Sequence, residues 1–119
     1  MKAVIVAVMS FLVWLQSLPT VNPLEVGSCQ WDMIGAQETH DFDLILEGGD
    51  GQFITVHGDC DCGMGLELYV YDDDGNLIGS DTEFQDNLTV WVPAGTAGWI
   101  TVRVVNSAGE ATSFTICVA

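Results

Sequence analysis

The stretch that decides the fold is Gly58–Gly79, which reads G-D-C-D-C-G-M-G-L-E-L-Y-V-Y-D-D-D-G-N-L-I-G. Apolar side chains at 66, 68 and 70 alternate with Glu67, Tyr69 and Tyr71. This period of two is typical of a strand with one face on a core. The following D-D-D-G-N supplies turn residues, and Leu77 begins a return strand. The stretch therefore predicts a β-hairpin within an all-β domain.

The same pattern of short alternating segments and Gly-, Pro- and Asp-rich turns continues along the chain from residue 39. The expected strands are residues 39–47, 53–57, 66–71, 77–80, 88–92, 99–105 and 113–118. Residues 28–38 are ambiguous. They could form a short edge strand or an irregular segment that leads into the domain and packs against it. Turn spacings of roughly 8–12 residues indicate an all-β sandwich or barrel.

The N-terminus has the organisation of a signal peptide. Met1-Lys2 is a short basic start, and Ala3–Leu15 is a 13-residue apolar stretch interrupted only by Ser10. This is the length of a signal-peptide core and is short for a membrane span, although an uncleaved anchor is the alternative. The expected parts are a signal peptide at 1–17, a linker at 18–28 and a β-sandwich domain at 29–119. We therefore expect a secreted, cell-surface or periplasmic protein.

The chain is strongly acidic. Its 17 Asp and Glu residues face 2 basic residues, which gives a formal net charge of −15. Such a surface repels phosphate backbones and anionic lipid headgroups, so nucleic acids and anionic membrane surfaces are excluded as partners. It favours cations and basic partners, and the acidity alone would also keep an exported protein soluble.

Four cysteines, Cys29, Cys60, Cys62 and Cys117, indicate disulfides in an exported chain of this length. Four cysteines allow three pairings. We favour Cys29 with Cys117, which would fasten the N-terminal lead to the last strand, and Cys60 with Cys62 in a tight ring. Pairing of Cys29 with Cys60 or Cys62 is the competing arrangement.

The central stretch also resembles a known family. G-L-E-L-Y-V-Y-D-D-D-G-N-L-I-G-S-D at 65–81 is similar to the signature D-L-D-L-Y-V-Y-D-x-x-G-N-L-V-A-x-D of bacterial pre-peptidase C-terminal domains. Flanking segments match in order: T-H-D-F-D-L at 39–44, G-Q-F-I-T-V at 51–56, V-W-V-P at 90–93, G-W-I-T-V-R-V at 98–104 and F-T-I at 114–116. The resemblance covers about residues 39–118.

This resemblance implies an all-β, antiparallel jelly-roll-like β-sandwich of about 7–9 short strands. It also implies a non-catalytic domain of the kind appended to secreted proteases. Related domains on collagenases bind fibrous substrate and calcium. An exported protease, acting in trans, is therefore one expected partner. The family's paired acids are here Gly65 and Glu67, so one acid is missing.

Clustered loop carboxylates form the first candidate site. Calcium takes six to eight oxygen ligands, so Ca²⁺ is the candidate cofactor. The candidate ligands are Asp59, Asp61, Asp72, Asp73, Asp74 and Asp81. The run at 72–76 lacks EF-hand spacing, and the alternative is that its Asp, Gly and Asn residues only form a hairpin turn.

Two further groups are candidates. His57, Cys60 and Cys62 could bind zinc or copper, although an oxidising compartment favours a disulfide over thiolate ligands. Tyr69 and Tyr71 share a strand face with Glu67, and exposed tyrosines beside acids suit sugars or extended peptides. The alternative is that these rings pack under loops or against tryptophans.

Enzyme motifs such as G-x-S-x-G, H-E-x-x-H and the P-loop are absent from the sequence. We predict an exported, non-catalytic binding or adhesion module that recognises an extracellular peptide or polysaccharide and is stabilised by calcium. The alternative is a structural or assembly component of an envelope or secreted protease complex. A small hydrolase that uses His40 and His57 is a third, weaker reading.

Overall fold

A computed structural model describes residues 23–59, 65–83 and 87–119, and the structural statements below concern these residues. Within them, no helix combines the length and the apolar character needed to cross a membrane. The strands are β1 (Pro23–Leu24), β2 (Cys29–Ile34), β3 (Thr39–Glu47), β4 (Gln52–Gly58), β5 (Leu66–Tyr71), β6 (Leu77–Asp81), β7 (Asn87–Val92), β8 (Ala97–Asn106) and β9 (Thr112–Val118). The predicted signal peptide at 1–17 lies outside the described residues.

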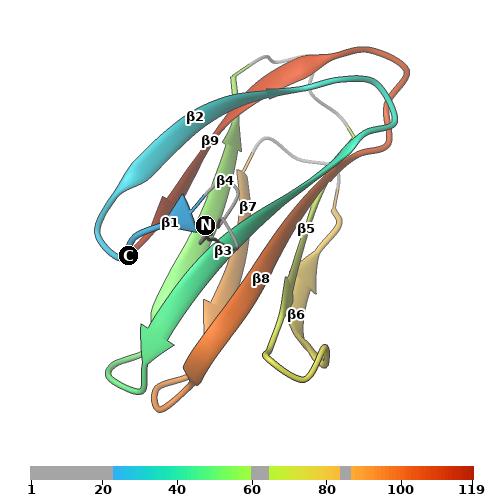
Figure 1. The fold of residues 1–119 in the computed structure, drawn as a ribbon. Coiled ribbons are helices and arrows are strands. Elements are labelled where there is room, and N and C mark those ends of the chain that lie inside the picture. Colours follow the sequence, from blue (N-terminus) through green and yellow to red (C-terminus); the bar gives the residue numbers. More distant parts are fainter. Residues whose placement is uncertain (1–22, 60–64, 84–86) are drawn as a thin grey trace, which may run out of the picture.

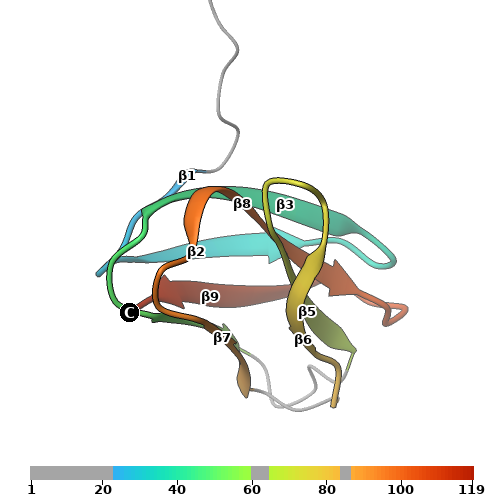
Figure 2. The ribbon, with the colours of Figure 1, turned by 90° about the horizontal axis from the view of Figure 1, so that it is seen from below.

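The strands form two facing sheets, which confirms the predicted all-β sandwich (Figure 1). One sheet has five strands in the order β1-β3-β8-β5-β6, and the other has four in the order β2-β9-β4-β7. Figure 2 shows β3 and β8 in one layer, with β9 and β7 in the other. All described pairings are antiparallel except that of β1 with β3.

The hairpin predicted from the central stretch is present as β5 and β6. Buried and half-buried residues alternate strictly along β5, as the sequence pattern predicts. The same alternation places the apolar positions of β3, β4, β7, β8 and β9 between the two sheets. Phe42 of β3 meets Phe114 of β9 edge to face across the core, with ring centroids 6.0 Å apart. This geometry is favourable for two aromatic rings.

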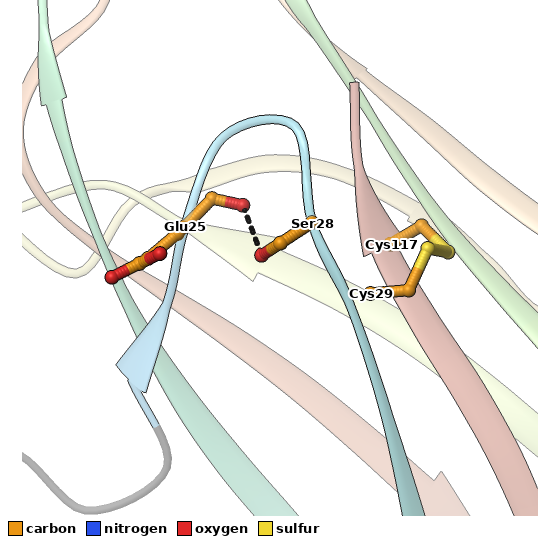
Figure 3. Close-up of a disulfide and its surroundings, with 4 residues drawn as sticks. All are labelled: Glu25, Ser28, Cys29 and Cys117. Atoms are coloured by element: carbon orange, nitrogen blue, oxygen red, sulfur yellow. Dashed lines mark hydrogen bonds between the residues drawn. A yellow bond between two sulfur atoms is a disulfide. The ribbon is translucent and has the colours of Figure 1, made fainter.

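The packed part of the chain starts earlier than the sequence analysis expects. Residues 18–28 are predicted as a linker, yet β1 lies within them and Leu24 is buried. Gly27 then turns the chain with a positive φ of 85°, and the Ser28 hydroxyl donates to the Glu25 carbonyl oxygen (Figure 3). The difference arises because a two-residue parallel strand depends on its partner β3 and leaves no periodic signal of its own.

Residues 28–38 prove to contain an edge strand, β2, which pairs along its whole length with β9. The register places Cys29 directly opposite Cys117, and the two form a disulfide (Figure 3). The predicted Cys29–Cys117 pairing is therefore confirmed. Cys60 and Cys62 lie outside the described residues.

The outer face of the four-stranded sheet has an unusual composition for so acidic a chain. By alternation, its outward side chains are those of Cys29, Trp31, Met33, Phe53, Thr55, His57, Asn87, Thr89, Trp91, Ser113, Thr115 and Cys117. None of these residues is Asp, Glu, Lys or Arg. We call this surface the neutral face.

Candidate ligand-binding site

The outer face of the five-stranded sheet gathers polar and aromatic side chains that are far apart in the sequence. The strand register places Asp41 of β3 opposite Arg103 of β8, and Arg103 opposite Tyr69 of β5. The adjoining row consists of Asp43, Thr101 and Tyr71. Glu67 and the two tyrosines therefore share one face, as the sequence predicts, and they lie half-buried beside β8.

Arg103 is the centre of this face and the one basic side chain among the described residues. Its Nε and Nη2 atoms donate to the two carboxylate oxygens of Asp41, at 2.8 and 3.0 Å. Its guanidinium carbon lies 5.2 Å from the centroid of the Tyr71 ring, a cation–π contact. The hydrogen bonds to Asp41 raise the pKa of Arg103 above its ordinary value, so the group stays charged. Two partners thus hold the guanidinium plane in place.

The second tyrosine is fixed by its neighbour on the same strand. The Tyr69 hydroxyl donates to Oε1 of Glu67 at 2.8 Å. This hydrogen bond, followed by partial desolvation, raises the pKa of Tyr69, so its proton remains on the phenol. The Tyr69 hydroxyl and the Arg103 guanidinium are therefore both held by hydrogen bonds to carboxylates on this face.

A shallow hollow of about 260 Å³ opens beside the stacked pair and is lined by Tyr71, Gly75, Thr101 and Arg103. Its outer wall is the β5–β6 turn. Asp72 holds that turn, because its Oδ1 accepts the backbone N–H groups of Asp74 and Asn76 at 2.9 Å each. Gly75 adopts a positive φ of 84°, which favours glycine there. The hollow combines a ring, a hydroxyl and a held cation, which suits a peptide segment.

Sequence reasoning found the tyrosines of this face but missed Arg103, Asp41 and Thr101. Arg103 and Asp41 are 62 residues apart, so only the β3–β8 register brings them together. For Trp99 the sequence predicts only a role as one of the tryptophans against which the tyrosines pack. It is 43% exposed, and its Nε1 donates to Asp43 Oδ1 at 3.0 Å. No local pattern in the sequence predicts the contacts of Arg103 with Asp41 or of Trp99 with Asp43.

The carboxylates predicted as calcium ligands do not gather at one place in the described structure. Asp72 is committed to its turn, and Asp73 lies against Gly98 at the start of β8. Asp81 is opposite Leu68, so it lies roughly 13 Å along the hairpin from that turn. Its two carboxylate oxygens accept the backbone N–H groups of Glu83 and Thr89.

Asp59 follows β4, where its backbone N–H donates to the Ser113 carbonyl. Within residues 23–59, 65–83 and 87–119, no group of three or more His, Cys, Asp or Glu side chains is close enough to hold a metal ion. Asp61, Cys60 and Cys62 lie outside those residues. Calcium binding near Asp59, and zinc or copper binding at His57, therefore stay predictions. In the structure His57 contacts the Asn87 side chain.

Thermal unfolding tests the calcium prediction. Binding to the native state alone should raise stability by about 2.7 kcal/mol when calcium exceeds its Kd about a hundredfold. We expect a rise of several degrees in Tm with calcium over chelator, and none with equal magnesium. Asp59→Asn should abolish the rise, whereas Asp72→Asn would also disturb the turn and is a poor test. An unchanged Tm with calcium would reduce these acids to turn formers and solubilising charge.

The architecture matches solved structures. The pre-peptidase C-terminal domain of a collagenase from Bacillus anthracis has a TM-score of 0.71 to this chain, at 13% sequence identity, over 86% of this chain and 98% of that one. This chain has the fold of a pre-peptidase C-terminal domain. The resemblance predicted from the sequence is thus confirmed at the level of the fold.

A second solved structure is similar over a comparable length. It is the periplasmic inhibitor of g-type lysozyme from Aeromonas hydrophila, with a TM-score of 0.52 and 14% identity over 84% of this chain and 98% of that one. No protein-family model matches the chain, and no curated protein matches its sequence. At identities this low, the comparisons show the shared pre-peptidase C-terminal fold and do not identify a ligand.

Proposed function

We propose that this protein is a non-catalytic binding module that acts outside the cytoplasm and recognises an extended segment of a partner protein. The observation that carries the proposal is the fixed Tyr71–Arg103–Asp41 assembly beside a shallow hollow. Side chains that are already held in one conformation lose little entropy when a ligand binds, which favours recognition.

The side chains on this face are better suited to binding a peptide than to catalysing a reaction. Half-buried tyrosines offer ring surface for side chains and hydroxyls for backbone groups, and such residues are enriched at protein interfaces. The guanidinium of Arg103 carries five N–H donors, and its two hydrogen bonds to Asp41 use one on Nε and one on Nη2, so further N–H groups can donate to peptide carbonyls. The two histidines are engaged elsewhere: His40 lies between Asp32 and Glu38, and His57 contacts Asn87.

The similar structures support a binding role, since one is a domain of a collagenase and the other is an inhibitor of g-type lysozyme. By their names, the parent enzyme of the first domain acts on collagen, and the second protein inhibits g-type lysozyme. A segment presented by an exported protein, including a protease in trans, is the corresponding partner for this chain. Calcium remains the proposed structural cofactor of the acidic loops.

Binding to immobilised gelatin and to g-type lysozyme tests the proposal with two defined probes, one an extended peptide and one a folded protein. We expect the exported chain to bind gelatin, and Tyr71→Ala to weaken that binding by about tenfold, the loss expected for an aromatic anchor. Tyr71→Phe keeps the ring under Arg103 and should lose much less.

The matched control is Trp91→Ala, which removes an aromatic ring from the neutral face and should leave gelatin binding unchanged. Thermal melts of each variant separate loss of the site from loss of the fold. Equal binding by the wild type and Tyr71→Ala would contradict the assignment of this face. Release of the protein into the soluble exported fraction favours a binding module, whereas retention in an envelope complex favours the structural alternative.

A further inference from the structure

The neutral face carries four large exposed apolar side chains in a chain whose formal charge is −15. The exposed fractions are 61% for Trp31, 56% for Met33, 50% for Phe53 and 49% for Trp91. Exposed apolar patches of this kind mark interaction sites on soluble proteins. This face is on the opposite side of the sandwich from Tyr71 and Arg103, so the proposed peptide site does not account for it.

The rings stand at two opposite corners of the face. Phe53 and Trp91 are cross-strand partners whose ring centroids lie 4.6 Å apart. Trp31 lies two strands away from β4, level with Thr115 and His57. The strand spacing and the rise per residue put Trp31 roughly 16 Å from Phe53. A ligand that touches both corners must therefore be extended.

Hydrogen-bonding side chains fill the space between the corners. The register places Thr115 between Trp31 and His57, and Thr55 between the disulfide and Thr89. Hydroxyl groups of threonine both donate and accept. The face thus has rings at two corners and hydroxyls between them, unlike the continuous apolar centre of a tight protein interface.

Gly51 leaves room for one aromatic ring of this face, because it has no side chain. A Cβ atom on Gly51 would lie 2.1 Å from Cζ2 and 2.3 Å from Cη2 of Trp91. Gly51 has no positive φ, so its backbone does not itself require glycine. The missing side chain therefore makes room for the Trp91 indole to lie against the start of β4 instead of standing off the sheet.

The negative charge of the chain indicates which class of ligand this face could bind. A second copy of the chain would bring a further charge of −15, and an anionic polymer would also be repelled. A basic partner would be drawn to the carboxylates, none of which is among the outward side chains of this face. An uncharged polysaccharide meets no repulsion, its C–H faces pack on the negative faces of aromatic rings, and its hydroxyls match the threonines.

We propose that the neutral face binds an uncharged, linear polysaccharide that spans from Trp31 to the Phe53–Trp91 pair. The proposal is independent of the peptide site on the other sheet, and either can fail alone. It assigns a positioning role to Gly51 and contact roles to the three aromatic residues.

Affinity electrophoresis and pull-down of the exported chain test it with cellulose, chitin, xylan and starch as uncharged probes and polygalacturonate as the anionic probe. We expect binding to at least one uncharged probe and none to polygalacturonate. Trp31→Ala and Trp91→Ala should each weaken binding by about tenfold, as for the loss of an aromatic anchor. Tyr71→Ala should leave it unchanged.

Gly51→Ala provides a second variant that displaces the Trp91 ring without removing it, and because its Cβ would also lie 2.9 Å from the Val92 carbonyl oxygen, a thermal melt checks that the fold is kept. We expect it to weaken polysaccharide binding while the Trp31 contact persists. Failure to bind any of the four uncharged probes would overturn the proposal, as would binding that survives both tryptophan substitutions. A dimer that becomes monomeric in Trp31→Ala, measured by light scattering, would identify a second copy as the occupant and would also overturn it.

Discussion

Replacing Cys29 and Cys117 together by serine is expected to lower the free energy of unfolding by about 4–5 kcal/mol, because the disulfide closes a loop with a sequence separation of 88. A cross-link over so long a loop restricts the unfolded chain strongly. It also fastens β2, an edge strand, to β9. For a domain of this size the loss corresponds to a fall in Tm of roughly 20 °C or more. Denaturant unfolding of the oxidised protein measures it.

The matched control replaces Cys60 and Cys62 by serine. If these two pair with each other, they close a very short loop, and its removal changes the entropy of the unfolded chain little. We therefore expect a much smaller loss of stability from this pair. An equal loss from both double variants would contradict the Cys29–Cys117 pairing and favour a crossed arrangement.

Asn106→Ala is expected to cost about 3 kcal/mol of stability, because it removes a buried side chain whose three hydrogen bonds to partly buried backbone groups are lost together. Asn106 is 1% exposed. Its Nδ2 donates to the carbonyl oxygens of Gly35 and Glu110, at 3.0 and 2.8 Å, and its Oδ1 accepts the Ala108 N–H at 3.0 Å. The side chain thus ties the β2–β3 turn to the β8–β9 turn.

Asn87→Ala serves as the comparison, since it removes the same side chain from the exposed start of β7, where its contact is with the exposed His57. We expect its effect to stay within about 0.5 kcal/mol, as is usual for surface substitutions. Urea unfolding with a two-state fit gives both values. A loss for Asn106→Ala no larger than that for Asn87→Ala would show that the turns hold together without this side chain.

Much of the fold follows from local pattern. Alternation along residues 66–71 predicts β5, its buried face and the outward tyrosines, because a strand with one buried face must repeat every two residues. Proline and glycine mark the end of β7 and the start of β8. The short β1 escapes prediction, and β2 is predicted only as one of two alternatives, because these strands depend on pairing with β3 and β9.

The candidate sites also differ in whether a local sequence pattern predicts them. Tyr69 and Tyr71 are found from the sequence, since residues two apart on a strand share a face. The Arg103–Asp41 pair and the meeting of Trp91 with Gly51 require strand register and close packing, which no local pattern contains. The neutral face could have been found by listing the outward residues of four predicted strands and noticing that none is charged.

We propose that this sandwich carries two separate binding faces, one on each sheet. The most direct test measures the dissociation constants of wild type, Tyr71→Ala and Trp31→Ala for both gelatin and the uncharged polysaccharide that binds best. We expect Tyr71→Ala to weaken only gelatin binding and Trp31→Ala to weaken only polysaccharide binding. A folded variant that loses both gelatin binding and polysaccharide binding would contradict the assignment of two separate faces. So would the result that neither variant loses either binding activity.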